Sequence, residues 1–149
     1  MRTIETLLQQ VAENTNGVEY YGRGAKAYSN IETPKYPRIW IHYVNPFDMV
    51  NQNNFVSTEY NIVGEVSAPV DFTADIANAT PSTLLYLTTL ETLQDIFYRF
   101  VTNLNKHPLN LKAIGKVTRK EFLHEYDDNL CGYVFNFTLL IKEPIPYQC

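Results

Sequence analysis

The sequence predicts an α+β fold, a mainly antiparallel β-sheet with an N-terminal helix and one long central helix packed on one face. Residues 80–108 and 1–16 both repeat apolar side chains at the spacing of an amphipathic helix. Residues 55–70 and 130–142 alternate apolar and polar side chains, as half-buried strands do. Two helices interspersed with hairpins indicate this layered arrangement.

The central helix has the clearest pattern. Thr80 can cap its N-terminus, Pro81 suits its first position, and Pro108 prevents its continuation, which predicts a helix about 40 Å long. Its apolar stripe contains Tyr86, Leu87, Leu90, Leu93, Ile96, Phe97, Phe100, Val101 and Leu104. Because this stripe and the strand at 130–142 are the largest apolar surfaces, we expect their central members to be buried together, namely Leu93, Phe97, Phe100, Tyr133, Phe135 and Phe137.

The first half of the chain is predicted in four parts after the first helix. A short strand covers 18–21, and a loop rich in Gly and Pro covers 22–38. A strand follows at 38–45, with Ile39, Ile41 and Tyr43 on one face and Trp40, His42 and Val44 on the other. Residues 46–54 are predicted to be a turn-rich loop.

After the central helix we expect a strand at 111–122 and a last strand at 130–142. The length of 149 residues fits a single domain, 1–149, from which the loops 22–38 and 46–54 project. No internal repeat interrupts this order.

Composition narrows the class of function. The net charge of −4 argues against a surface that binds nucleic acid everywhere. Charged residues make up 19% of the chain, below the roughly 25% of ordinary domains, and there are 11 tyrosines. A surface made of Asn, Thr, Gln and Tyr suits polar protein–protein contacts.

No residues are predicted to be catalytic, to bind a cofactor or to ligate a metal. Residues 22–27 match a GxGxxA pattern, but Thr33-Pro34 follow where a dinucleotide site needs a helix. His42 is interpreted as a packed strand residue, and residues 124–128 (HEYDD) as a solvated turn without zinc or calcium spacing. Cys131 and Cys149 are far apart and form no CxxC pair.

We expect no membrane segment, since no apolar run approaches about 20 residues. Met1 leads directly into the first helical pattern, so we also expect no signal peptide and synthesis in a cytoplasm.

Two surfaces are predicted to be interfaces. The loop 22–38 contributes four basic residues, Arg23, Lys26, Lys35 and Arg38, which would face an acidic protein or phosphates, or simply solvent. The loop 46–54 contributes Phe47, Met49 and Val50, apolar residues that have no place in the core pattern.

The order of elements, and the C-terminal sequence YVFNFTLLIKEPIPYQC, resemble the neck and tail-terminator proteins of tailed bacteriophages. The resemblance covers most of the chain and involves no diagnostic residue motif. It implies a structural subunit without enzyme activity or cofactor, located in the virion. Its partners would be copies of itself in a ring around the DNA passage and neighbouring portal, adaptor or tail proteins.

An alternative remains open at this point. A small cytoplasmic α+β enzyme or ligand-binding domain would have the same elements, with its pocket between helix and sheet.

Overall fold

The computed structural model describes residues 2–24, 35–51, 55–70, 82–123 and 130–144. In chain order the elements are α1 (Thr3–Glu13), β1 (Tyr20–Arg23), β2 (Arg38–Asn51), β3 (Phe55–Pro69), α3 (Ser82–Lys106), β4 (Thr118–Leu123) and β5 (Leu130–Pro144).

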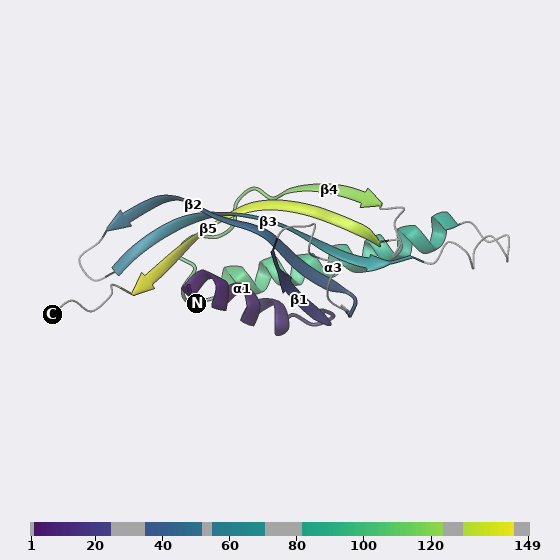
Figure 1. Cartoon of the computed structure of the whole chain (residues 1–149), viewed down its shortest axis with the longest axis horizontal. Helices are drawn as coiled ribbons and strands as arrows, with labels where there is room; N and C mark the ends of the chain where they lie inside the picture. Colours follow the sequence, from purple (N-terminus) through teal and green to yellow (C-terminus); the bar gives the residue numbers. More distant parts are fainter. Residues whose placement is uncertain (1, 25–34, 52–54, 71–81, 124–129, 145–149) are drawn as a thin grey trace.

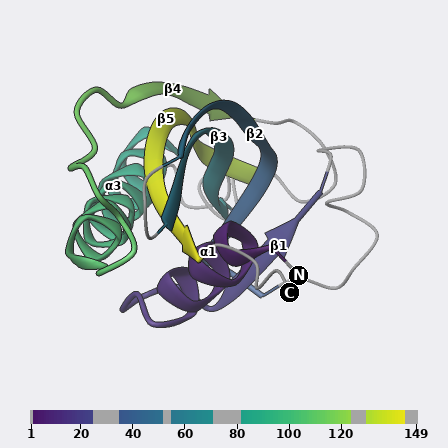
Figure 2. The same cartoon turned by 90° about the vertical axis from the view of Figure 1, so that its left-hand side faces the viewer.

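The strands form one curved sheet in the order β1-β2-β3-β5-β4. β1 pairs with β2 in parallel, and all other neighbouring strands are antiparallel. Both helices lie on the same face of the sheet (Figures 1 and 2). The predicted α+β fold class is therefore confirmed.

Aromatic side chains of α3 and β5 form the centre of the core between the helices and the sheet. The ring of Phe97 lies 4.6 Å from that of Phe135, and Phe135 lies 5.6 Å from Phe137, measured between ring centroids. The predicted cluster is confirmed for Leu93, Phe97, Phe100, Phe135 and Phe137, which are all buried, whereas Tyr133 is only partly buried at its margin.

The apolar stripe of α3 contains fully buried residues only from Leu90 onwards, with Tyr86 partly buried against the core. Leu87 was predicted to belong to the stripe, but 53% of it is exposed. The reason is visible in Figure 1, where the N-terminal turns of α3 extend beyond the ends of the strands and have no sheet to pack against. The predicted cap at Thr80 and Pro81 lies outside the described residues.

β2 is longer than predicted, and two bulges change which way its side chains face. Ile41 and Tyr43 oppose successive residues of β3, which makes His42 an extra residue, and Phe47 is a second extra residue. The bulge at His42 shifts the alternation by one. Val44 is therefore buried in the core and Tyr43 is 54% exposed, the reverse of the prediction.

The loop predicted at 46–54 is wrong for residues 46–51, because β2 continues to Asn51, while residues 52–54 lie outside the described residues. Beyond the helices neither face of the hairpin needs an apolar row, so the period-two signal of a strand is missing from the sequence.

Two other boundaries differ from the prediction. β1 begins and ends two residues later than expected. β4 contains only Thr118–Leu123, and in the preceding segment Asn110 forms an isolated bridge to Ile141 of β5. The backbone of 109–111 thus covers the edge of β5 where β4 does not reach it.

Candidate functional site

The far half of β2 is the most exposed regular element of the described chain. Every residue from Asn45 to Asn51 is exposed, including the three apolar ones, with Phe47 at 56%, Met49 at 65% and Val50 at 49%. In Figure 1 this end of the hairpin extends past α1 together with the end of β5. The predicted interface residues of this segment therefore lie on one strand and face solvent.

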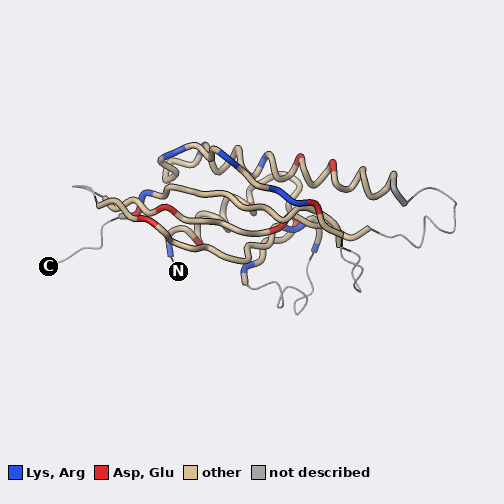
Figure 3. The backbone as a smooth tube through the Cα atoms, turned by 90° about the horizontal axis from the view of Figure 1, so that it is seen from above, with Lys and Arg blue, Asp and Glu red and all other residues tan. Residues whose placement is uncertain are grey.

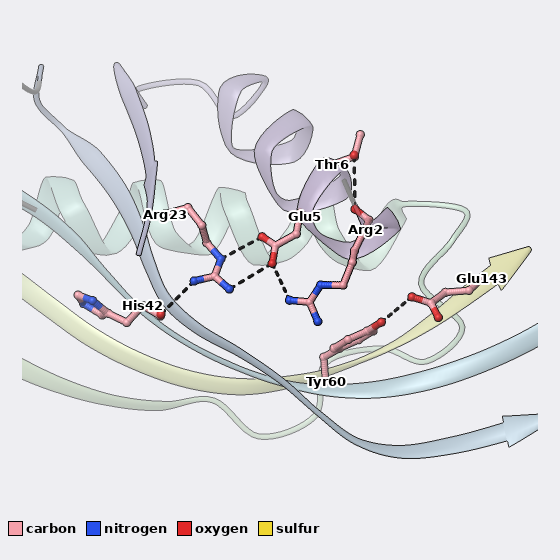
Figure 4. A network of polar contacts seen from close by, with 7 residues as sticks. All are labelled: Arg2, Glu5, Thr6, Arg23, His42, Tyr60 and Glu143. Atoms are coloured by element: carbon pink, nitrogen blue, oxygen red, sulfur yellow. Dashed lines mark hydrogen bonds and ion pairs between the residues drawn. The ribbon is translucent and has the colours of Figure 1, made fainter. Parts of the chain in front are cut away.

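The hairpin end is held in place by β5 rather than being a loose extension. β3 pairs with β5 over its full length, to Phe55 opposite Pro144. The Tyr60 hydroxyl donates a 2.5 Å hydrogen bond to Oε1 of Glu143 (Figure 4). The Thr58 hydroxyl donates to Oε2 of the same carboxylate at 3.2 Å. The exposed residues of β2 are thus displayed on a rigid three-stranded support.

The same contact affects the ionisation of Tyr60. Burial of its hydroxyl, followed by the hydrogen bond to Glu143 and the negative charge of that carboxylate, raises the pKa of Tyr60 to about 12. Tyr60 therefore remains a neutral donor at physiological pH, so the contact stays intact.

β2 also exposes its backbone. β1 covers β2 only from Arg38 to Ile41. Among the described residues, Tyr43–Asn51 pair only with β3, and we call this stretch the open edge of β2. Because alternate residues of a strand direct N–H and C=O to opposite sides, about half of these groups point away from β3.

The basic surface predicted from 22–38 is divided in the structure. Arg38 does not face a partner, because its side chain is only 1% exposed and lies on the sheet face opposite the helices. Its Nε donates to Ser67 Oγ at 3.1 Å, and its Nη2 is 3.5 Å from Glu65 Oε1. The guanidinium also lies 5.3 Å from the ring centroids of Tyr36 and Trp40.

The side chain of Arg23 forms an ion pair with Glu5 of α1. Its Nε donates to Glu5 Oε2 at 2.9 Å, and its Nη1 donates to the carbonyl oxygen of His42 at 3.0 Å (Figure 4). Burial alone would raise the pKa of Glu5, but the hydrogen bonds and charges of Arg23 and Arg2 together lower it. Lys35 is exposed, and Lys26 lies outside the described residues.

The structure places both glycines of the GxGxxA pattern next to Trp40. A Cβ on Gly22 would lie 1.9 Å from the Trp40 ring, and the Trp40 indole N–H donates to the carbonyl oxygen of Gly24 at 2.8 Å. Gly22 thus makes room for the Trp40 ring, and Gly24 accepts a hydrogen bond from it, which the sequence pattern could not indicate. The remaining positions of the pattern, and residues 124–128, lie outside the described residues.

The described residues offer little support for metal binding, for a cysteine nucleophile or for a ligand pocket. Among them, no three His, Cys, Asp or Glu side chains are close enough to hold a metal ion. Burial, reinforced by the charge of Glu121, raises the pKa of the Cys131 thiol to about 12, so this cysteine is a poor nucleophile. The space between helices and sheet, where the alternative reading places a pocket, contains the aromatic core.

A second exposed edge escaped the sequence reasoning. β4 is the opposite border of the sheet, and five of its six residues are exposed, including Arg119 and Lys120. Arg119 donates a hydrogen bond to the Tyr98 hydroxyl of α3 at 3.1 Å, and Figure 3 shows Lys and Arg positions along this side of the molecule. The sequence TRKEFL could have indicated this edge, because it places charged residues within a predicted strand. Charged side chains commonly protect the edge strands of sheets from unwanted pairing.

No protein-family model matches the chain, and no curated protein has a significantly similar sequence. In the described part of the chain, no helix is both long enough and apolar enough to cross a lipid bilayer.

Proposed function

We propose that the chain is a structural virion subunit that forms a ring at the head–tail junction or tail end of a tailed bacteriophage. It would act through protein–protein interfaces around the DNA passage, without catalysis. The observation that carries the proposal is the rigid, projecting end of β2, where Phe47, Met49 and Val50 are each about half exposed or more. Solvent-exposed apolar residues grouped on a sheet edge are typical of an interaction surface.

The assignment to a phage has separate support. It depends on the resemblance in element order and on the low-charge, Tyr-rich composition. The partners would be copies of the chain and neighbouring portal, adaptor or tail proteins. Of the four basic residues first considered for the DNA or neighbour contact, Lys35 and Lys26 remain candidates, since Arg38 is buried and Arg23 binds Glu5.

The test is the assembly state of the purified chain. Light scattering after gel filtration should give a mass that is a multiple of the subunit mass and grows with protein concentration up to one closed species. Electron microscopy of that species should show rings with a central opening. A protein that remains monomeric at high concentration, and whose melting temperature rises with a small metabolite, would favour the ligand-binding alternative.

A further inference from the structure

We propose that the open edge of β2 (Tyr43–Asn51) binds the β4 edge of a second copy of this chain, adding strands so that the sheets of neighbouring subunits become continuous. The proposal rests on the proposed ring and identifies the two surfaces that would form its subunit contact. The contact is heterologous, because one subunit uses β2 and the next uses β4, and contacts of this type generate rings when the rotation closes.

The two edges are free on opposite borders of the sheet. β4 pairs with β5 on one side, and among the described residues no strand covers its other side. The open edge of β2 is longer than the six residues of β4, so β4 fits alongside it without displacing β1. Paired edges would satisfy backbone groups that otherwise bind only water.

Strand directions also agree. β2, β3, β5 and β4 are successively antiparallel, so β4 runs opposite to β2. A head-to-tail repeat keeps these directions, and β4 of one copy therefore meets β2 of the next in antiparallel orientation. The two outer faces remain on the same side, as a continuous sheet requires.

Charge distinguishes β4 from a second β2 as the occupant. Asp48 is exposed and opposes Glu59, which places both carboxylates on the sheet face away from the helices. Lys120 of β4 opposes Val134 and lies on the same outer face. β2 against β4 therefore brings Asp48 to Lys120, whereas β2 against β2 would bring acidic residues together.

The register that opposes Asp48 to Lys120 has consistent consequences. It places Val50 opposite Thr118 and the bulge at Phe47 beside Glu121. Lys120 is level with Trp40 across the sheet, so successive copies are offset by about 20 Å along the strands and about 19 Å across them. The strands then cross the line of repeat at about 45°, close to the tilt of about 35–45° in closed barrels.

Charge reversal and its rescue test the pairing. Asp48→Lys and Lys120→Asp should each raise the apparent dissociation constant of assembly about tenfold or more, and the double variant should restore it to within about threefold of wild type. Asp95→Lys and Lys112→Asp reverse charges that are also exposed but lie outside both edges, and these variants should assemble normally. Single reversals without effect, or a double variant no better than either single, would overturn the pairing.

Cysteine cross-linking identifies the partner edge directly. In a Cys149→Ser background, Asp48→Cys combined with Lys120→Cys should give a ladder of disulfide-linked oligomers on mild oxidation, while either change alone should give none. A linked dimer from Asp48→Cys alone would show β2 against β2 and overturn the proposal. A wild-type ring that tolerates all these reversals refutes only the edge pairing, whereas a wild-type monomer refutes the ring itself.

Discussion

Arg38 and Glu65 form an ion pair that is buried on the sheet face away from both helices. Nη2 of Arg38 lies 3.5 Å from Oε1 of Glu65, and the two side chains are 1% and 2% exposed. His42 approaches the same carboxylate oxygen, with Nε2 at 3.7 Å. Because both charges have left water, each depends on the other for compensation.

We expect Arg38→Met to destabilise the protein by about 3–5 kcal/mol, because it removes the buried guanidinium that faces the Glu65 carboxylate. The double variant Arg38→Met/Glu65→Leu should recover most of this loss, since apolar side chains of similar size can replace a buried pair. Denaturation in urea measures both. Lys35→Met, at an exposed position of the same segment, should change stability by less than about 0.5 kcal/mol. Equal losses in the single and double variants would contradict this interpretation.

The aromatic core predicts a second large loss. Phe97 is 1% exposed and contacts the rings of Phe100, Phe135 and Phe137. Phe97→Ala should therefore cost about 3–5 kcal/mol in the free energy of unfolding. Leu84→Ala on the exposed end of the same helix should cost less than about 0.5 kcal/mol. A loss below about 1 kcal/mol for Phe97→Ala would be inconsistent with its central place in the core.

The pH dependence of stability should report on Glu5. Its folded-state pKa is lowered, so its ionised form stabilises the fold above the unfolded pKa of about 4.3, and this contribution is lost as the pH falls through the folded pKa. Glu5→Gln should cost about 1 kcal/mol at pH 7 and progressively less below about pH 4. Urea denaturation at several pH values measures this, with the exposed Glu19→Gln as control. A loss that is the same at pH 3 and pH 7 would exclude the carboxylate charge as its cause.

The sequence predicted well those elements whose pattern records a single buried face. α3 repeats apolar residues because one side of it packs on the sheet, and β5 alternates because Phe135, Phe137 and their neighbours enter that same core. In both elements the residues that are buried recur at the period of the helix or strand, so the sequence pattern alone identifies the buried face.

The hairpin end and the buried ion pair could not be predicted in the same way. Residues 46–51 project past the helices, so their side chains are exposed whichever way they point, and a bulge at Phe47 further breaks the alternation. Arg38 is the first residue of β2 and follows a loop-like stretch of sequence, which suggests solvent exposure. Its partner Glu65 lies on a strand reached only through the β2–β3 pairing.

The exposed apolar residues of β2 give the most direct test of the proposed assembly. Phe47→Asp combined with Met49→Asp should abolish assembly, because two carboxylates would have to lose their water in the contact. The melting temperature of the monomer should change little, since 56% of Phe47 and 65% of Met49 are already exposed. Light scattering and thermal denaturation measure the two effects. Leu84→Asp combined with Leu87→Asp, at the exposed end of α3, is the matched control and should still assemble. Unfolding of the Phe47/Met49 variant would assign the hairpin end to the subunit's own stability, and normal assembly would move the contact to another surface.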